Sequence, residues 1–404
     1  MEFSEPRDRF WIGLRFGLMA AGMLALLGGL WSGLLRLGGA GPLLQPALPA
    51  AHGPLMVCGF LGTLISLERA VALGRPWAFL APVATGVGGA LTLAGVGGAA
   101  GPLLITAGSL GLVAIFGVVL SIQAVPFAVV MASGAGAWLG GNALWLSGWP
   151  VHALVPWWIG FLVLTIAGER LELSRMLFHA PWTKRLFLGL VGVLAAGLLL
   201  SVEAPDLGFR VMGAGLAAIA LWLGVYDMAR RTVQAEGLTR FIAVCLLAGY
   251  AWLLLGGGLA LYFGNTGAGL VYDATLHAVF VGFVFSMIFG HAPVIFPSVL
   301  GISIPYRPFF YVHVALLHVS LLLRVGGDLM LVESLRAWGG WGNAGAILLF
   351  LGATAASVLL GGDAQTDEAS AGSRQRDFGG PAESQSELDG PPEEGPDLEL
   401  PSGE

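Results

Sequence analysis

The chain has 404 residues, of which 56% are apolar and 11% charged, whereas an ordinary soluble domain carries about 25% charged residues. This composition excludes a water-soluble globule. The formal net charge of −6 arises at one end of the chain, because residues 363–404 hold twelve of the 25 acidic residues and only two arginines. The preceding part has 17 basic and 13 acidic residues without a basic stripe, so we expect no nucleic-acid partner.

Three segments follow from the charge distribution. Residues 1–10 mix acidic and basic side chains and precede many apolar segments, so we predict a cytoplasmic N-terminus without a cleaved signal peptide. Residues 11–361 are predicted to form the transmembrane domain. Residues 362–404 are rich in Pro, Gly, Ser and acidic residues and contain almost nothing to bury, so we predict a disordered acidic cytoplasmic tail.

The transmembrane domain divides into helical spans. A helix needs about 20 mainly apolar residues to cross a bilayer, and charges, Pro residues and Gly clusters mark the boundaries. The sequence thus predicts an all-α membrane protein with twelve spans. These are residues 11–35, 50–72, 78–98, 102–121, 126–147, 151–170, 186–202, 208–228, 238–262, 271–290, 308–326 and 338–361.

Basic residues predict the orientation, because short cytoplasmic loops carry an excess of Lys and Arg. With the N-terminus inside, four of these residues fall on the outer side: Arg36, Arg210, Arg324 and Arg336. Ten fall on the inner side: Arg69, Arg75, Arg170, Arg175, Lys184, Arg185, Arg230, Arg231, Arg240 and Arg307. We therefore expect both termini in the cytoplasm of a bacterium and a multi-pass protein of its inner membrane.

Neither the cysteines nor the glycines indicate a catalytic motif. Cys58 and Cys245 lie in apolar runs, which excludes a disulfide framework and a CxxC motif. The 63 glycines lie mostly within the spans. A dinucleotide-binding loop would need a βαβ unit, so we interpret the glycines as sites of close helix packing.

The second, sixth and tenth predicted spans share a pattern. Each begins with a histidine near one end, continues to a Gly-Phe pair and closes with a polar residue. Because the spans are four helices apart, they cross the membrane in the same direction, which predicts a pseudo-threefold arrangement of four-helix units. The shared residues are His52 with Gly59 and Phe60, His152 with Gly160 and Phe161, and His277 with Gly282 and Phe283.

These histidines are candidate ligands. An ionisable side chain inside a membrane is costly and normally faces the bundle interior, where it marks a site. Imidazole is the commonest protein ligand of metals and an axial ligand of haem iron. We therefore expect His52, His152 and His277 to converge around one or two cofactors. Alternatively, His52 and His152 only cap their helices or lie among lipid headgroups.

The eleventh predicted span adds two histidines. His313 and His318 are five residues apart and point about 140° apart around a helix, so they serve different sites. His318 lies near the depth of His277, whereas His313 lies near the depth of His291. We expect an outer haem level and a separate inner polar level. The inner level is alternatively a cluster of ion pairs among Glu68, Arg69, Glu169 and Arg170.

Two sequence motifs resemble known families. The run His-Gly-Pro-Leu-Met-Val-Cys-Gly-Phe from His52 resembles the second helix of subunit I of the heme-copper oxidases, in which helices two and ten bind the low-spin haem and helix six supplies a copper ligand. The run from Leu276 to His291 is more similar to the NnrS family, twelve-span haem-binding proteins linked to the nitric oxide response of denitrifying bacteria. The resemblance covers residues 11–361.

The resemblance implies specific ligands. His52 and His277 correspond to the axial ligands of a haem, of b type, and His152 to a ligand of a further metal such as copper. No His-His pair occurs on span seven, no His-Pro-Glu on span six and no His-x-His on span ten or eleven, which argues against a three-histidine copper centre. The candidate metal ligands are His52, His152, His277, His291 and His313; the candidate haem contacts are His52, His277 and His318.

The expected function is that of a haem-binding membrane protein which takes part in the nitric oxide response or related redox chemistry, with nitric oxide and an electron donor as partners beside the lipid bilayer. Proton pumping is not expected, and the sequence leaves open whether the protein turns over a substrate. Two alternatives also remain open. One is a twelve-helix secondary transporter, since many carriers have internal repeats. The other is a non-catalytic protein that handles haem or metal.

Overall fold

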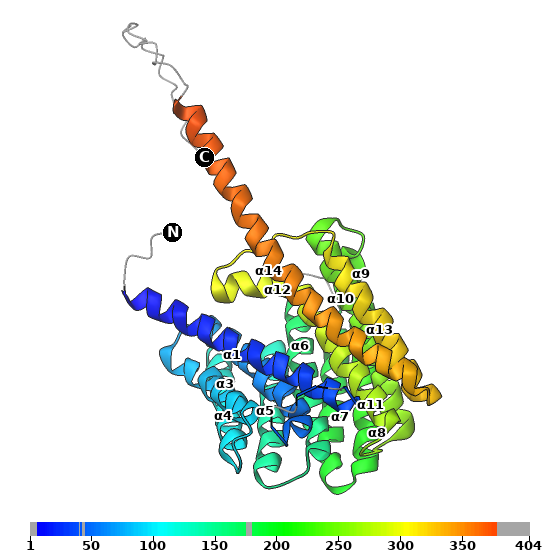
Figure 1. The fold of residues 1–404 in the computed structure, drawn as a ribbon. Helices are drawn as coiled ribbons and strands as arrows, with labels where there is room; N and C mark the ends of the chain where they lie inside the picture. The colour runs from blue at the N-terminus through cyan, green and yellow to red at the C-terminus, as the bar shows by residue number, and fades with distance from the viewer. Residues whose placement is uncertain (1–5, 40, 43–44, 175–179, 378–404) are drawn as a thin grey trace, which may run out of the picture. The chain divides into compact units, whose positions relative to one another are not determined.

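A computed structural model describes residues 6–39, 41–42, 45–174 and 180–377. Twelve helices within these ranges are long and apolar enough to cross a membrane (Figure 1), and no strand occurs among the described residues. The all-α class and the number of spans predicted from the sequence are therefore confirmed. His179, which we expected to be a solvated loop residue, lies outside the described residues.

The helices follow the predicted order. The first six spans are α1 (Pro6–Arg36), η2 with α2 (Pro54–Gly62 and Thr63–Leu73), η3 with α3 (Pro76–Phe79 and Leu80–Leu93), α4 (Ala100–Ile122), α5 (Pro126–Leu146) and α6 (Val151–Leu173). The other six are α7 (Pro181–Glu203), α8 (Pro205–Tyr226), α10 (Gly237–Phe263), α11 with η5 and α12 (Leu270–His277, Ala278–Phe285 and Ser286–Leu300), α13 (Phe310–Met330) and α14 (Glu333–Asp377). Two short helices, η1 (Leu48–Ala51) and α9 (Ala229–Thr232), lie between spans.

Proline and glycine set many of the helix ends. Pro126, Pro181 and Pro205 each stand at the start of a helix, where the missing N–H costs nothing and the fixed φ suits the first turn. Gly74 and Gly301 follow α2 and α12 with φ of 66° and 72°, a left-handed conformation that favours glycine. Proline and glycine thus separate consecutive helices within long apolar runs.

Several predicted boundaries differ from the structure by five residues or more, among them the ends of the third and tenth spans. The third span ends at Leu93 rather than at residue 98, because Gly95 and Gly98 adopt positive φ and turn the chain. The tenth span continues to Leu300 rather than ending at residue 290. Pro293 removes one backbone donor from α12, but the helix ends only where Gly301 takes a left-handed conformation.

The last helix also differs from the expectation. α14 continues to Asp377, so it includes the first part of the segment that the sequence predicts to be disordered. Residues up to 358 belong to one compact unit, which is the helical bundle, and residues from 359 belong to a second unit. The site described below lies entirely in the first unit.

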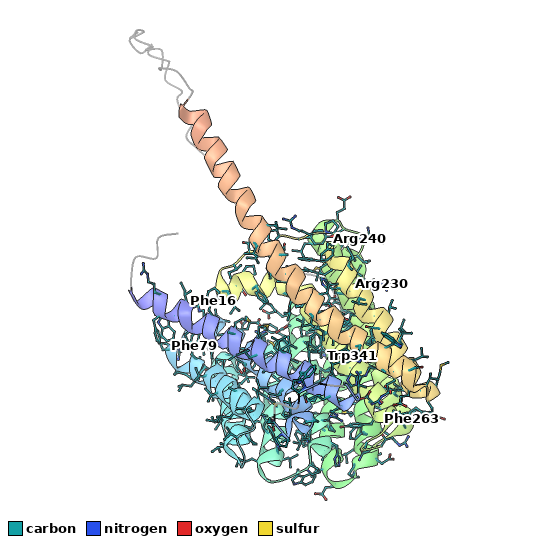
Figure 2. All side chains as sticks on the ribbon, viewed as in Figure 1. Phe16, Phe79, Arg230, Arg240, Phe263 and Trp341 are labelled. Atoms are coloured by element: carbon teal, nitrogen blue, oxygen red, sulfur yellow. The ribbon has the colours of Figure 1, made fainter. Side chains whose placement is uncertain are left out.

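The bundle has an apolar exterior and two chemically different ends. Phe16 and Trp341 lie on the outside (Figure 2) and are 41% and 44% exposed, as lipid-facing side chains would be. Figure 2 places Arg230 and Arg240 at the opposite end of the bundle from Phe263. We call the end with Arg230 and Arg240 the ion-pair end, and the end at which the predicted ligands His52 and His277 lie the histidine end.

The repeated Gly-Phe pairs are packing positions. A Cβ added at Gly59, Gly160 or Gly282 would lie 2.9 Å from Ala25, 2.5 Å from Leu198 and 2.4 Å from Trp252, respectively, so each glycine allows a neighbouring helix to approach closely. The phenylalanine that follows each glycine is at most 2% exposed. The repeat thus supports the bundle in all three places, independently of any ligand.

Candidate functional site

A cavity of about 650 Å³ lies at the histidine end of the bundle. His52, His152 and His277 all line it, so the structure brings together the three histidines of the repeat. Most other lining residues are apolar and come from α1, η2, α6, η5 and α14. A mostly apolar hollow of this volume with a few polar groups is typical of a small-molecule or cofactor site.

His52 and His277 face this cavity as a pair. Their ring centres are 6.5 Å apart and their ring planes differ by 16°. The Nδ1 atom of His52 is 2.8 Å from the carbonyl oxygen of Gly29 on α1. The Nδ1 atom of His277 is 2.8 Å from the carbonyl oxygen of Asp273, one turn earlier on α11. Two spans that are far apart in the sequence therefore present imidazoles in equivalent settings.

The hydrogen bonds determine where each imidazole carries its proton. A carbonyl oxygen only accepts hydrogen bonds, so both Nδ1 atoms must donate. A neutral imidazole has a single N–H, and the Nε2 atom of each ring is left with a free lone pair. Metal-ligating histidines almost always have this arrangement, because the second hydrogen bond fixes the tautomer and orients the ring. A metal would therefore meet these two imidazoles at Nε2.

The local backbone supports both histidines in a similar way. The π-helix η2 begins two residues after His52, and the π-helix η5 begins directly after His277. Long π-helical segments are rare, and π-type turns within helices occur frequently at functional sites. α6, which carries His152, is an α-helix with Pro156 inside it. The second and tenth spans therefore resemble each other more closely than either resembles the sixth.

Space around His52 is provided by a glycine. A Cβ at Gly33 on α1 would lie 2.9 Å from Cε1 and 3.0 Å from Nδ1 of the imidazole, closer than real side chains come. The short helix η1, directly before His52, is tied to α1 because the Ser32 hydroxyl donates to the carbonyl of Leu48. α1 therefore holds the imidazole through the Gly29 carbonyl and leaves room for it at Gly33.

An ionic network surrounds His277. Arg324 donates from Nε and Nη2 to the Asp273 carboxylate, at 3.1 and 2.9 Å. Arg336 Nε is 3.0 Å from Asp328 and 3.9 Å from Asp273. The other oxygen of Asp273 is 3.4 Å from His277 Nδ1. These charges join α11, α13 and α14 beside the cavity.

The sequence analysis missed this network, although a signal was present. Asp273 stands four residues before His277, a spacing that places both on one helical face. Arg324 falls inside a predicted span, where a charged residue indicates a functional site by default. We counted it only as one of the basic residues of the outer side. Arg324, Arg336 and Arg36 all line the cavity.

His318, which we predicted as a haem contact, does not join the pair. It is absent from the cavity lining. The indole Nε1 of Trp252 donates to its Nδ1 at 3.0 Å, which places the proton of a neutral imidazole on Nε2. A protonated Nε2 has no lone pair for a metal. The tautomer is therefore the reverse of that in His52 and His277.

His313 and His291 also lie away from the cavity. His313 is 1% exposed and is enclosed by phenyl rings, with the Phe289 and Phe350 centres at 4.8 and 5.4 Å. Within the described residues neither of its nitrogens has a hydrogen-bond partner. His291 donates from Nδ1 to the Met287 carbonyl at 2.7 Å. We expected these two histidines at a separate inner level, and neither of them lines the cavity.

Polar residues at the ion-pair end are paired with one another. Arg69 contacts both Glu68 and Glu169. Arg170 forms a bidentate pair with Asp227, both N···O distances being 2.8 Å, and its side chain is 6% exposed. The alternative that we left open for the inner level, a cluster of ion pairs, agrees with these contacts. Asp227 is a partner that the sequence analysis did not foresee.

The donor set at the cavity limits the kind of metal that fits. Among the described residues, no three or more His, Cys, Asp or Glu side chains are placed to hold a metal ion together. A bare ion such as Zn²⁺ needs at least three protein ligands, whereas haem iron has four porphyrin nitrogens and takes only one or two ligands from the protein. Two prepared imidazoles on an apolar cavity therefore fit a haem better than a bare ion.

Comparison with known families gives one match. The family model for a domain of unknown function, DUF8744, matches residues 15–359, which includes the whole site and nearly the whole bundle. No curated protein and no solved structure matches the chain.

Proposed function

The chain belongs to the DUF8744 family, and we propose that it is a haem-binding membrane protein in which His52 and His277 are the axial ligands of one haem. The observation that carries this proposal is the pair of imidazoles whose Nδ1 atoms both donate to carbonyls while both side chains line one cavity. A ligating nitrogen lies about 2 Å from its metal, so two imidazoles on opposite sides of one metal have ring centres about 6 Å apart. The separation of 6.5 Å fits this requirement.

The remaining lining residues suit a porphyrin. Met56, Phe280 and Phe285 supply apolar contacts, and burial of apolar surface stabilises a bound macrocycle. Arg36 supplies positive charge at the histidine end, where it can pair with a carboxylate substituent of the porphyrin. When bound, a haem supplies one-electron redox chemistry and an iron centre for small gases. The residues hold the ring, fix both imidazole tautomers and exclude water from the apolar walls.

The wider setting belongs to the same proposal. We place the histidine end at the outer side of a bacterial inner membrane and both termini in the cytoplasm, because basic loop residues gather at the ion-pair end. The close packing at the three Gly-Phe pairs and the position of the three histidines at one cavity support a pseudo-threefold architecture like that of heme-copper oxidase subunit I. His152 lines the cavity, but within the described part of the chain no three or more His, Cys, Asp or Glu side chains are placed to hold a metal ion together, so we do not propose copper.

Redox chemistry linked to nitric oxide, as in the NnrS family, is the function that we propose within this frame. Two histidines on one iron leave no permanently open coordination position, which favours electron transfer or gas sensing over oxygen reduction. In either role, His52 and His277 are the residues that bind the haem.

The proposal is tested by haem content. Protein purified from haem-replete cells should contain one haem per chain with the spectrum of a six-coordinate low-spin iron. The double variant His52→Ala and His277→Ala should contain none. His313→Phe is the matched control, because a phenyl ring suits its aromatic surroundings, and it should retain the haem. Folded wild-type protein without haem would contradict the proposal.

A further inference from the structure

The two proposed axial ligands have different hydrogen-bond partners. His52 donates from Nδ1 to the neutral carbonyl of Gly29. His277 donates from Nδ1 to the carbonyl of Asp273 and also has the carboxylate of the same residue at 3.4 Å. An acceptor that carries negative charge strengthens a hydrogen bond and raises the basicity of the ligating nitrogen. The two ligands therefore differ in the charge beside Nδ1, because His277 has the Asp273 carboxylate next to it.

The Asp273 carboxylate cannot swing freely. Two hydrogen bonds from the Arg324 guanidinium fix one of its oxygens, and Arg336 lies 3.9 Å from that oxygen. Asp273 is 19% exposed at its side chain and Arg324 only 10%, so these contacts are shielded from water and last longer than those of a surface pair. The arginine orients the carboxylate, and it also draws part of the negative charge away from the imidazole.

The two ligands also differ in how their backbones are held. His277 lies in the continuous helical span Leu270–Leu300, and its carbonyl acceptor is on the same helix. His52 lies between the short helix η1 and the π-helix η2, and its acceptor belongs to another helix, α1. The position of His52 therefore depends on contacts between segments that are separate in the chain. The imidazole of His277 can leave only by rotating away from its own helix and its carboxylate partner.

We infer that Asp273, oriented by Arg324, is a positioning residue that makes His277 the permanent axial ligand, and that His52 is the exchangeable ligand which gives way to a small neutral gas. This inference rests on the proposed haem site. In the exchange, the bond from His52 Nε2 to the iron breaks and a bond from the gas forms. No electron or proton moves, and the neutral imidazole remains hydrogen-bonded through Nδ1.

The rate at which the reduced protein binds carbon monoxide tests which ligand exchanges. Wild type should bind carbon monoxide in a phase whose rate levels off at high gas concentration, because the departure of His52 limits it. His52→Ala should keep its haem and bind the gas without that limit. His277→Ala should lose most of its haem. If His277→Ala retains the haem and binds the gas fast while His52→Ala does not, the assignment is reversed and the inference is wrong.

Vibrational spectroscopy tests the role of Asp273. In the reduced His52→Ala protein, the stretching frequency of the bond between iron and His277 should fall in Asp273→Asn, because the carboxylate no longer raises the basicity of the imidazole. It should rise in Arg324→Gln, because the carboxylate then turns its full charge toward Nδ1. The reduction potential should shift up in the first variant and down in the second. Asp206→Asn, the same substitution at an acid that pairs with Arg210 on α8, should change neither quantity.

The failures of the two proposals can be distinguished. Absence of haem from every variant and from wild type would refute the haem site itself. Haem in wild type combined with an unchanged frequency in both Asp273→Asn and Arg324→Gln would leave the haem site standing and refute the role of Asp273.

Discussion

The two ends of the helical bundle both contain histidine and charged residues, but they use them differently. At the histidine end, two imidazoles whose Nδ1 atoms donate to carbonyls line a cavity of about 650 Å³. At the ion-pair end, the charged groups contact one another, as Arg170 does with Asp227. Buried charges that are paired hold helices together, whereas buried lone pairs at a cavity are available to a ligand.

This contrast shows that the function of a buried histidine depends on its tautomer and on the space beside it. The sequence pattern places His318 near the membrane depth of His277, but the indole of Trp252 donates to its Nδ1. His313 has phenyl rings where a ligand would have to lie. Among the described histidines, His52 and His277 combine a hydrogen bond that fixes the lone pair on Nε2 with a position at the cavity. Variants at the two ends should therefore separate the stability of the bundle from the binding of haem.

The largest effect is expected at the ion-pair end. Arg170→Ala leaves the carboxylate of Asp227, which is 3% exposed, without its partner, and breaking a buried pair in this way costs about 3–5 kcal/mol. The free energy of unfolding in detergent should fall accordingly, while the haem content of the protein that remains folded stays the same. Arg230→Ala, at an exposed arginine of the same end, is the control and should change stability little. A normal unfolding curve with loss of haem would break the proposed separation of the two ends.

A smaller effect is expected from the packing beside His52. In Gly33→Ala the new methyl group would lie 2.9 Å from the imidazole, so the ring must move, and haem affinity should fall about 10- to 100-fold, as it does when outer-shell partners of a metal ligand are altered. Titration of the haem-depleted protein with haem measures this change. Gly17→Ala on the same helix has nothing within 4 Å of the new atom and should bind as wild type does. Equal affinities in the two variants would show that α1 does not shape the site.

The smallest effect is expected at His318. His318→Phe removes the acceptor of the Trp252 indole, which should lower the free energy of unfolding by about 1 kcal/mol. Its absorption spectrum and haem content should equal those of wild type, because His318 does not line the cavity. A changed spectrum would restore the role that the sequence pattern suggested for this residue.

Much of the fold could be predicted because a bilayer imposes one length scale on apolar helices. All twelve spans follow from hydropathy, and the boundary errors occur where single residues decide, as at Gly95 and Gly301. The pairing of His52 and His277 follows from the repeat, since helices that cross in the same direction bring equivalent residues to one depth.

The details of the site could not be predicted in the same way. The tautomer of His318 depends on Trp252, which is 66 positions away in the chain. The partners of Asp273 lie on α13 and α14, and their approach is a result of packing that no local pattern records. The surroundings of His313 come from phenylalanines on several helices.

The proposed haem site is tested most directly by an experimental density map of the protein purified from haem-replete cells. We expect a porphyrin in the cavity, with its iron about 2 Å from the Nε2 atoms of both His52 and His277. A cavity filled by lipid, or a haem bound through other residues while these two imidazoles remain free, would contradict it.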